Sequence, residues 1–476
     1  MRRTPEITLP LRINPADGTL PEQVAAQLRD LISADVLAPG DPIPSSRALA
    51  QHLGVSRGSV VAAYDQLLAE GYVSAAAGQG TVVNPQLRRV HPPAPLPKPR
   101  RSEPAPAALL DLRPGRPWTG DLVGPQWKAA WRRAANAPAD AQPPGLGLPE
   151  LRRAWSDHLR RMRALVRDPD SIAVTGGGRD GLALILLALQ RPGFRVGVED
   201  PGYPSLRRVP ARYGAGVVPL PVDEHGLITN RLPAQGEAPE LLLVTPSHQY
   251  PLGGSLPMDR RQELLEWAHD HRVVIVEDDY DSELRYTSSP LPALAALDDP
   301  VDGRVVLLST LSKTITPALA TGFLALPQWL VPAVAAIRSD LGQPQGLVSQ
   351  RAIAEFLQVG ALRIHTQRMR QRYRRRRAEV VSALRDRPGL AVYPMDGGLH
   401  AVVETERDEA EVVSELAARG VVVSPLSQYW SQAGSRRGIV FGFGAVTAAE
   451  LATGLHQIAE VASSPALPTA TPRKAD

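Results

Sequence analysis

At 476 residues the chain exceeds the roughly 250 to 300 residues at which one hydrophobic core stops growing, so at least two domains are expected. Its 43% hydrophobic and 21% charged residues exclude a mainly disordered chain, and the absence of cysteine excludes disulfides, thiolate metal sites and cysteine nucleophiles. The net charge of +4 does not by itself predict a nucleic-acid partner, because residues 1–83 hold six arginines against eight acidic residues.

The N-terminal residues hold no continuous apolar run of the length that a signal peptide needs, and Pro10 interrupts the best candidate. No stretch elsewhere approaches the roughly 18 to 20 apolar residues of a membrane span. We therefore expect a cytoplasmic protein without a membrane partner, which agrees with the absence of disulfides.

Two short helices are predicted at the start of the chain. Thr19 and Glu22 have the spacing of a capping box, which predicts the beginning of the first helix. Its apolar face holds Val24, Leu28, Leu31 and Ile32. Ser45 or Ser46 is expected to cap the second helix, RALAQHL, which ends at Gly54.

A third helix follows after the short turn GVS, so the pair has the form of a helix-turn-helix. Ser56 is expected to cap it and Gly71 to end it. Its predicted inward face holds Val60, Val61, Tyr64, Leu67 and Leu68. The next segment, YVSAAAGQGTVV, indicates two short strands around a GQG turn, as in the wing of a winged helix.

Candidate DNA contacts cluster on these two helices. Arg47 lies on the second helix, and Ser56, Arg57 and Ser59 lie at the start of the third, where the inward valines leave them facing outward. A recognition helix places its N-terminal residues against base edges, where arginine can bind guanine while serines hold phosphates. A small helical domain without a DNA role is the alternative.

Residues 20–83 resemble the winged-helix domain of GntR-type bacterial regulators. The supporting stretches are APGD, PSSRALA, GVSRGSVVAAYDQL, EGY and GQGT. The resemblance implies operator DNA as the partner. It also implies that the DNA-contacting positions are Arg47, Ser56, Arg57, Ser59, Gly78 and Gly80.

A proline-rich stretch, NPQLRRVHPPAPLPKPRRSEPAP, separates this region from the rest of the chain. Proline fixes φ and removes hydrogen-bond donors, so a semi-rigid extended linker is expected. The predicted organisation is a DNA-binding domain at 1–83, a linker at 84–108, a large domain at 109–462 and a disordered tail at 463–476.

In the large domain, short Val, Ile and Leu runs that end in Gly, Asp or Pro alternate with helical stretches. Near-continuous apolar runs are typical of strands buried on both faces. We therefore predict an α/β domain with a mainly parallel sheet and a ligand site at the carboxyl ends of its strands.

The segments VEDDYDSELRY and STLSK place chemically useful side chains at two such ends. A desolvated lysine, Lys313, can form a Schiff base with pyridoxal phosphate, and a buried carboxylate, Asp278, can keep the pyridine nitrogen protonated. Tyr280 can donate to the ring phenolate, Tyr203 can stack on the ring, and TGGGRDG can hold the phosphate through backbone amides. Each of these features alone is also compatible with a solvated lysine, a helix cap or a simple turn.

Together they resemble the fold-type I, pyridoxal-phosphate-dependent transferase domain of the MocR regulators, which fuse it to a GntR-type winged helix. The supporting stretches between Asp111 and Ala459 include GLPELRRAW, TGGGRDGL, VEDPGYPSLR, VTPSHQYPLGGSLPMDRR, STLSKTITPAL, MRQRYRRRR and PLSQYW. The resemblance implies that the cofactor-binding positions are Lys313, Asp278, Tyr280, Tyr203, Gly178, Arg179, Thr310 and Ser312. It also implies a homodimer.

Three positions depart from the family pattern. Ala320 stands where the phosphate-clamping arginine is usual, seven residues after Lys313, and Gly178 stands where a hydroxyl residue is common. Arg179 is a candidate replacement for the clamp. Val440 stands where aminotransferases hold the arginine for the substrate carboxylate, with Arg436 and Arg437 close by in sequence.

The run RIHTQRMRQRYRRRR holds eight arginines between Arg363 and Arg377 and no acidic residue. The favoured interpretation is the charged face of a long helix, with Met369 and Tyr373 facing inward. Contact of this helix with DNA phosphates is the alternative.

These features favour a transcription regulator, not an enzyme, whose non-catalytic or vestigial aminotransferase domain binds pyridoxal phosphate and senses it or its adduct with an amino compound. Genes of vitamin B6, amino-acid or amine metabolism are the expected targets. One alternative is a regulator whose large domain lacks the cofactor and acts as a scaffold or senses another ligand. A second alternative is an active aminotransferase, against which Ala320 and Val440 count.

Overall fold

The computed structural model describes residues 9–14, 18–76, 80–87, 109–140, 142–286, 291–431 and 436–463. The chain forms two compact units, Met1–Pro104 and Ala105–Asp476, each with its own core. Most of the predicted linker and tail falls outside the described residues; only 84–87 of the former and Ser463 of the latter lie inside them.

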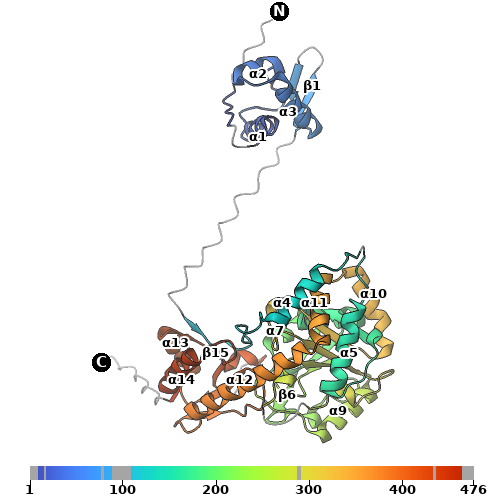
Figure 1. Ribbon diagram of the computed structural model, residues 1–476, viewed down its shortest axis with the longest axis vertical. Coiled ribbons are helices and arrows are strands. Elements are labelled where there is room, and N and C mark those ends of the chain that lie inside the picture. The colour runs from blue at the N-terminus through green and yellow to red at the C-terminus, as the bar shows by residue number, and fades with distance from the viewer. Residues whose placement is uncertain are drawn as a thin grey trace, which may run out of the picture. The chain divides into compact units, whose positions relative to one another are not determined.

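The first unit has three helices and a two-stranded hairpin (Figure 1). Its elements are α1 (Leu20–Ser33), α2 (Ser46–Leu53), α3 (Arg57–Ala69), β1 (Val73–Ala76) and β2 (Gly80–Val83). The predicted ends are confirmed: the Thr19 amide donates to Glu22 Oε2 over 3.2 Å, and Ser45 and Ser56 cap α2 and α3. Gly54 closes α2 in the left-handed conformation with φ 65°.

The prediction for the inward face of α3 is partly wrong. Val60, Tyr64 and Leu67 are buried as expected, but Val61 is 37% and Leu68 49% exposed, and Ala63 is buried. Val61 and Leu68 lie seven residues apart, so they share a stripe beside the buried 60, 63/64, 67 stripe. The apolar run of α3 is therefore wider than the face that packs.

The second unit is built from alternating strands and helices (Figure 1). As far as Gly322, they are β3 (Leu110–Asp111), α4 (Pro125–Ala135), α5 (Pro149–Arg163), β4 (Ile172–Thr175), α6 (Gly178–Leu189), β5 (Arg195–Asp200), α7 (Pro204–Arg207), α8 (Val209–Arg212), β6 (Gly216–Asp223), β7 (Gly226–Leu227), β8 (Leu241–Val244), α9 (Met258–His271), β9 (Val274–Asp279) and β10 (Val305–Thr310). From Gly322 on, they are β11 (Gly322–Ala325), α10 (Val331–Leu341), α11 (Leu347–Gln358), α12 (Ala361–Leu384), β12 (Leu390–Val392), β13 (His400–Thr405), α13 (Glu409–Ala418), β14 (Val421–Val422), β15 (Ser424–Pro425), β16 (Gly438–Gly442) and α14 (Ala448–Ser463). Short 3-10 turns lie at Pro169–Ser171, Thr229–Arg231, Ser282–Leu284, Leu294–Ala296, Pro317–Leu319, Gln328–Leu330 and Leu426–Tyr429.

The large sheet has the strand order β4-β11-β10-β9-β8-β5-β6-β7. Strands β10, β9, β8, β5 and β6 run parallel, β11 runs antiparallel to β4 and β10, and β7 is antiparallel to β6. Alternate residues of one strand enter different cores, because Val305 and Leu307 pack in one cluster and Val306 and Leu308 in the other. The predicted mainly parallel sheet with two buried faces is confirmed.

A smaller antiparallel sheet, β12-β13-β16-β15, packs with helices near the end of the chain. The long helix α12 runs beside it, drawn in orange in Figure 1, and buries Met369 and Tyr373 as predicted. Strand β3 pairs in parallel with β14, so the first strand of this unit joins the C-terminal part. Within the described stretches, no helix is long and apolar enough to cross a membrane.

Candidate functional sites

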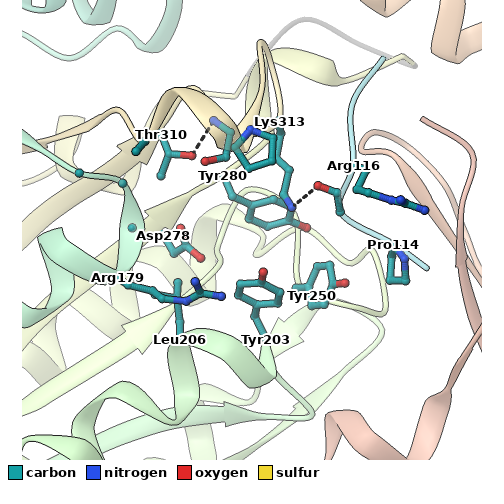
Figure 2. Close-up of a pocket in the computed structure, with 17 residues that line it drawn as sticks. Pro114, Arg116, Arg179, Tyr203, Leu206, Tyr250, Asp278, Tyr280, Thr310 and Lys313 are labelled. Carbon is teal, nitrogen blue, oxygen red and sulfur yellow. Dashed lines mark hydrogen bonds between the residues drawn. The ribbon is translucent and has the colours of Figure 1, made fainter. Parts of the chain in front are cut away.

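A cavity of about 470 Å³ opens where the large sheet's parallel strands end. Strands β9 and β10 end at Asp279 and Thr310, and the loops after β4 and β5 reach the same edge. The cavity brings together all eight residues predicted for a cofactor: Lys313, Asp278, Tyr280, Tyr203, Gly178, Arg179, Thr310 and Ser312 (Figure 2).

Asp278 and Lys313 place a carboxyl group and an amine in this cavity. Asp278 is 5% exposed, and burial, together with the nearby Asp279 and Asp281 carboxylates, raises its pKa to about 8. Burial lowers the pKa of Lys313 and so favours the neutral amine, against the pull of Asp281 and Asp278. The Lys313 Nζ donates to the Gly115 carbonyl over 2.8 Å.

Three tyrosines form the aromatic walls. The rings of Tyr203 and Tyr250 meet edge to face with centroids 5.1 Å apart, and Lys313 Nζ lies 5.8 Å from the Tyr203 centroid. The Tyr280 hydroxyl lies 2.9 Å from His248 Nδ1 and donates to the His248 carbonyl over 3.0 Å. His248 Nδ1 in turn lies 2.9 Å from Asp281 Oδ2. The Asp281–His248 pair therefore holds the Tyr280 hydroxyl in its orientation.

The glycine loop before α6 lines one end of the cavity. Asp180 accepts from the Gly176 amide over 2.9 Å and pairs with Arg338 over 2.7 Å, which holds the loop in place. Gly177 has φ 106°, so the chain turns sharply into the helix whose first residue is Gly178. Free amides at a helix N-terminus attract anions. Arg179 donates to Ser205 Oγ over 2.7 Å and lies at the same end.

The three residues that depart from the family pattern, Ala320, Gly178 and Val440, differ in their surroundings. Ala320 is exposed at the cavity wall with φ 47°. A Cβ added at Gly178 would have Thr310 Cγ2 as its nearest neighbour, at 3.5 Å, so the site has room for a small side chain. Val440 is fully buried. Its apolar cluster holds Tyr250, Val402, Leu426 and Tyr429.

Arg436 and Arg437 do not line the cavity. The Arg436 guanidinium lies 5.6 Å from the centroid of the Tyr393 ring and 3.7 Å from Glu404 Oε1. Arg437 is mostly exposed, 3.9 Å from Asp408. The two arginines that lie close to Val440 in the sequence therefore contact other groups and do not reach the cavity.

Several residues that line the cavity were not predicted from the sequence, among them Pro114, Gly115, Arg116, Leu206 and Tyr250. Tyr250 lies inside the stretch VTPSHQYPLGG, which already carried the resemblance, so its signal was present. The segment LRPGRP holds two prolines and a glycine, which indicates a loop but not its place at the cavity.

In the first unit, most of the predicted DNA-contacting residues are accessible to solvent. Arg47 on α2 and Ser56 and Arg57 at the start of α3 are exposed, and Ser59 is half-buried. The Ser56 and Ser59 hydroxyls lie 2.8 Å apart. Gly80 is exposed with φ 84° at the start of β2, whereas Gly78 lies outside the described residues.

The cavity fits the group that its fold class implies, pyridoxal phosphate. Its volume lies in the range of small-molecule sites, which span about 300–1,000 Å³. The buried Asp278 carboxyl suits a ring nitrogen, the glycine loop suits a phosphate, and Lys313 suits an aldehyde.

Comparisons with known proteins match both units. The family model for GntR-type bacterial regulatory proteins covers residues 20–83, and that for class I and II aminotransferases covers residues 118–455. The chain is 48% identical to the "HTH-type pyridoxine biosynthesis transcriptional regulator PdxR" of Corynebacterium glutamicum, over 92% of this chain and 94% of that protein.

A second relative is the "Probable rhizopine catabolism regulatory protein MocR" of Rhizobium meliloti, 31% identical over 96% of this chain and 98% of that protein. Among solved structures, an archaeal alanine:glyoxylate aminotransferase superposes with a TM-score of 0.68. It is 24% identical and covers 74% of this chain and 90% of its own, which establishes the fold of the large unit.

Proposed function

The chain belongs to the MocR-type members of the GntR family, DNA-binding transcription regulators with an aminotransferase class I and II domain, and we propose that its large unit binds pyridoxal phosphate through Lys313 and reports the bound state to the operator. When bound, this group supplies an aldehyde that amines attack and a ring that withdraws electrons. The regulated genes are those of vitamin B6 supply, because the 48% identical relative is named for pyridoxine biosynthesis.

The observation that carries the proposal is the convergence of four chemical functions on one cavity. Lys313 offers an amine whose pKa burial has lowered, and Asp278 offers a carboxyl buried in the same cavity. Tyr203 offers an aromatic face, and the α6 glycine loop with Arg179 offers an anion site. A scaffold that binds nothing has no need of a lysine and an aspartic acid buried together.

We also propose that the large unit is not an amino-acid aminotransferase. Catalysis of that reaction needs a fixed cation for the substrate carboxylate, and the position expected for it holds the fully buried Val440. Arg436 and Arg437 are engaged outside the cavity. An amine that carries a carboxylate therefore gains little binding energy at this wall.

For the DNA-binding unit we propose operator contacts from Arg47, Ser56, Arg57 and Ser59 and from the wing at Gly80. Neither Arg47 nor Arg57 makes an ion pair or a side-chain hydrogen bond within the described part of the chain, so both are available to phosphates or bases. Two copies of the chain binding paired half-sites would give the operator a palindromic form.

The alternative of a large unit without cofactor rests on Ala320 and Gly178, which remove two phosphate contacts. One titration separates the proposals. Purified protein and a Lys313→Ala variant are titrated with pyridoxal phosphate, followed by visible absorbance, borohydride reduction and peptide mapping.

A yellow band that requires Lys313, with a reduced adduct on that residue, is the expected result. Operator binding measured with and without the cofactor then shows whether occupancy is reported. No band at saturating cofactor contradicts the proposal and favours the scaffold. Turnover of amino acids by the yellow protein would favour an enzyme.

A further inference from the structure

The Lys313 amine contacts the segment through which the chain enters the large unit. Its Nζ donates to the Gly115 carbonyl over 2.8 Å, as the dashed line beside Arg116 in Figure 2 shows. Gly115 lies four residues after β3, the first strand after the undescribed residues 88–108 that lead from the DNA-binding unit. We propose that Lys313 holds this entry segment, residues 109–116, when the cofactor is absent and releases it on binding the cofactor.

The entry segment is a continuous piece of backbone from the chain entrance to the cavity. The Leu110 and Leu112 amides donate to the Gly420 and Val422 carbonyls, each over 2.8 Å. The Leu112 carbonyl accepts from the Gly442 amide over 2.6 Å. Residues 114–116 then line the cavity itself. Gly115 is therefore only three residues away from the Leu112–Val422 hydrogen bond.

The segment packs so closely on its other side that glycines are needed there. A Cβ at Gly442 would lie 3.0 Å from Pro114 Cα, and one at Gly444 would lie 2.4 Å from the Arg116 carbonyl oxygen. Beyond the glycines, Arg116 is tied back to Asp111 by a 2.9 Å ion pair within the segment. On the cavity side, Lys313 donates a hydrogen bond to the Gly115 carbonyl, and a Cβ added at Gly115 would lie 2.8 Å from Nζ.

The chemistry of Lys313 makes its two partners mutually exclusive, an argument that rests on the proposed function. A neutral amine carries two hydrogens, one of which Nζ donates to Gly115. Condensation with an aldehyde forms a C=N bond at Nζ, breaks the C=O bond and releases one water that carries away both hydrogens. The nitrogen keeps no hydrogen, or one when a proton returns to it, and its position is then set by the bound ring. The Gly115 carbonyl loses its donor in the same step.

Hydrogen–deuterium exchange of the full-length protein tests this inference, with the Leu110 and Leu112 amides as reporters because they donate to the Gly420 and Val422 carbonyls. Wild type is measured without and with pyridoxal phosphate, and Lys313→Ala without it. Loss of one hydrogen bond corresponds to up to roughly tenfold faster exchange. We expect this acceleration in cofactor-loaded wild type and in cofactor-free Lys313→Ala. Lys128→Ala, which removes an exposed lysine from α4, should exchange as wild type does.

Amides of β9 report whether the variants stay folded, and Lys313→Met replaces Lys313→Ala if the alanine variant loses their protection. The inference is overturned if the folded variant exchanges at Leu110 and Leu112 as slowly as wild type. It is equally overturned if wild type with a full yellow band keeps its slow exchange, although the proposed function then stands. If no band forms, the proposed function fails, and the cofactor-free variants alone decide whether Lys313 holds the segment.

Discussion

Asp278 carries a carboxyl group whose ionisation differs strongly between the unfolded chain and the cavity. Its pKa rises from the ordinary 3.8 to about 8, with burial as the main cause. Between these values the folded protein binds one proton more than the unfolded chain, so stability falls as the pH rises through this window. The buried Asp278 carboxyl therefore lowers the free energy of unfolding of the cofactor-free protein at neutral and higher pH.

Replacing Asp278 with asparagine should therefore stabilise the cofactor-free protein at pH 8 by about 1 to 3 kcal/mol, because the buried carboxyl no longer ionises. At pH 4 the variant and wild type should unfold alike. Urea unfolding at both pH values measures this, with Asp302→Asn as the exposed control. If the variant and wild type differ in their free energy of unfolding by the same amount at pH 4 and pH 8, Asp278 does not titrate in this range.

Ala320 offers a second test at the scale of one residue. It lies at the cavity wall and already has the left-handed φ of 47°, so an arginine there adds no new backbone cost for the folded state beyond that of alanine. Ala320→Arg should tighten pyridoxal phosphate binding roughly tenfold at low salt, through a charge-assisted contact to the phosphate. Ala320→Met has a similar length without charge and serves as the control in the absorbance titration. Equal affinities for the two variants would contradict a phosphate at this wall.

The residues of the cavity differ in how far the sequence could predict them. Asp278 lies at the end of β9, Tyr280 directly follows that strand, and Lys313 lies three residues after β10. Because parallel strands bring their carboxyl ends to one edge, the meeting of these residues was predictable. Gly115 reaches the cavity only because β3 pairs with β14, about 310 residues later in the chain. No local pattern encodes a two-residue strand with a partner that distant.

At the scale of elements, α3 presents its N-terminal turn to solvent. The Arg57 side chain is exposed there, beside the Ser56 cap. Arg57→Ala should weaken operator binding roughly ten- to hundredfold, the range for loss of a specific arginine contact. Arg12→Ala is the matched control, because its backbone groups, not its side chain, bond to Gln27. Fluorescence anisotropy against operator and unrelated DNA measures both, and a loss equal on the two DNAs would assign Arg57 to a phosphate.

Helix α12 carries the arginine run, and several of these arginines bind the protein's own backbone. Arg370 donates to the Arg285 carbonyl over 3.1 Å and Arg374 to the Tyr286 carbonyl over 2.8 Å, while Arg372 lies 3.8 Å above the Trp118 ring. A charged face of a long helix can thus be structural without contacting DNA. Arg370 and Arg374 thus provide hydrogen-bond donors for two backbone carbonyls of the loop that follows Tyr280.

Arg374→Ala should lower the free energy of unfolding by about 1 to 2 kcal/mol, because the Tyr286 carbonyl loses a charged donor. Arg375→Ala is the control, since Arg375 is exposed and has no hydrogen bond or ion pair in the described stretches. The salt dependence of operator binding should be unchanged in both. A slope that falls by about one in either variant would instead place α12 against DNA phosphates.

The helix ends were predictable and the buried faces less so. Capping residues act within three positions, so Ser56 and Gly54 signal an end locally. Which stripe of α3 packs is decided by α1 and α2, and an all-apolar Val60–Val61 pair does not distinguish the two stripes. Likewise, the apolar sequence of β11 resembles those of the parallel strands, and only its pairing with β4 and β10 shows that it runs in the opposite direction.

On the scale of the whole molecule, the described residues form separate cores in the two units. The cluster around Leu28, Val60 and Leu67 belongs to the first, and the clusters around the two sheets belong to the second. Units with separate cores unfold as separate cooperative transitions unless an interface couples them. Regulation by a bound cofactor then depends on the single covalent connection through the entry segment and residues 88–108, or on contacts made in the assembled complex.

Scanning calorimetry should therefore show two transitions, the larger in enthalpy from the second unit because unfolding enthalpy scales with the number of residues. Pyridoxal phosphate should raise the midpoint of the larger transition alone, since at one hundred times its Kd a ligand stabilises the unit that binds it by about 2.7 kcal/mol. Lys313→Ala should remove this shift and leave the smaller transition where it was. If the cofactor moves both midpoints together, the two units are coupled by more than their covalent connection, and the released entry segment is not the sole route by which occupancy reaches the DNA-binding unit.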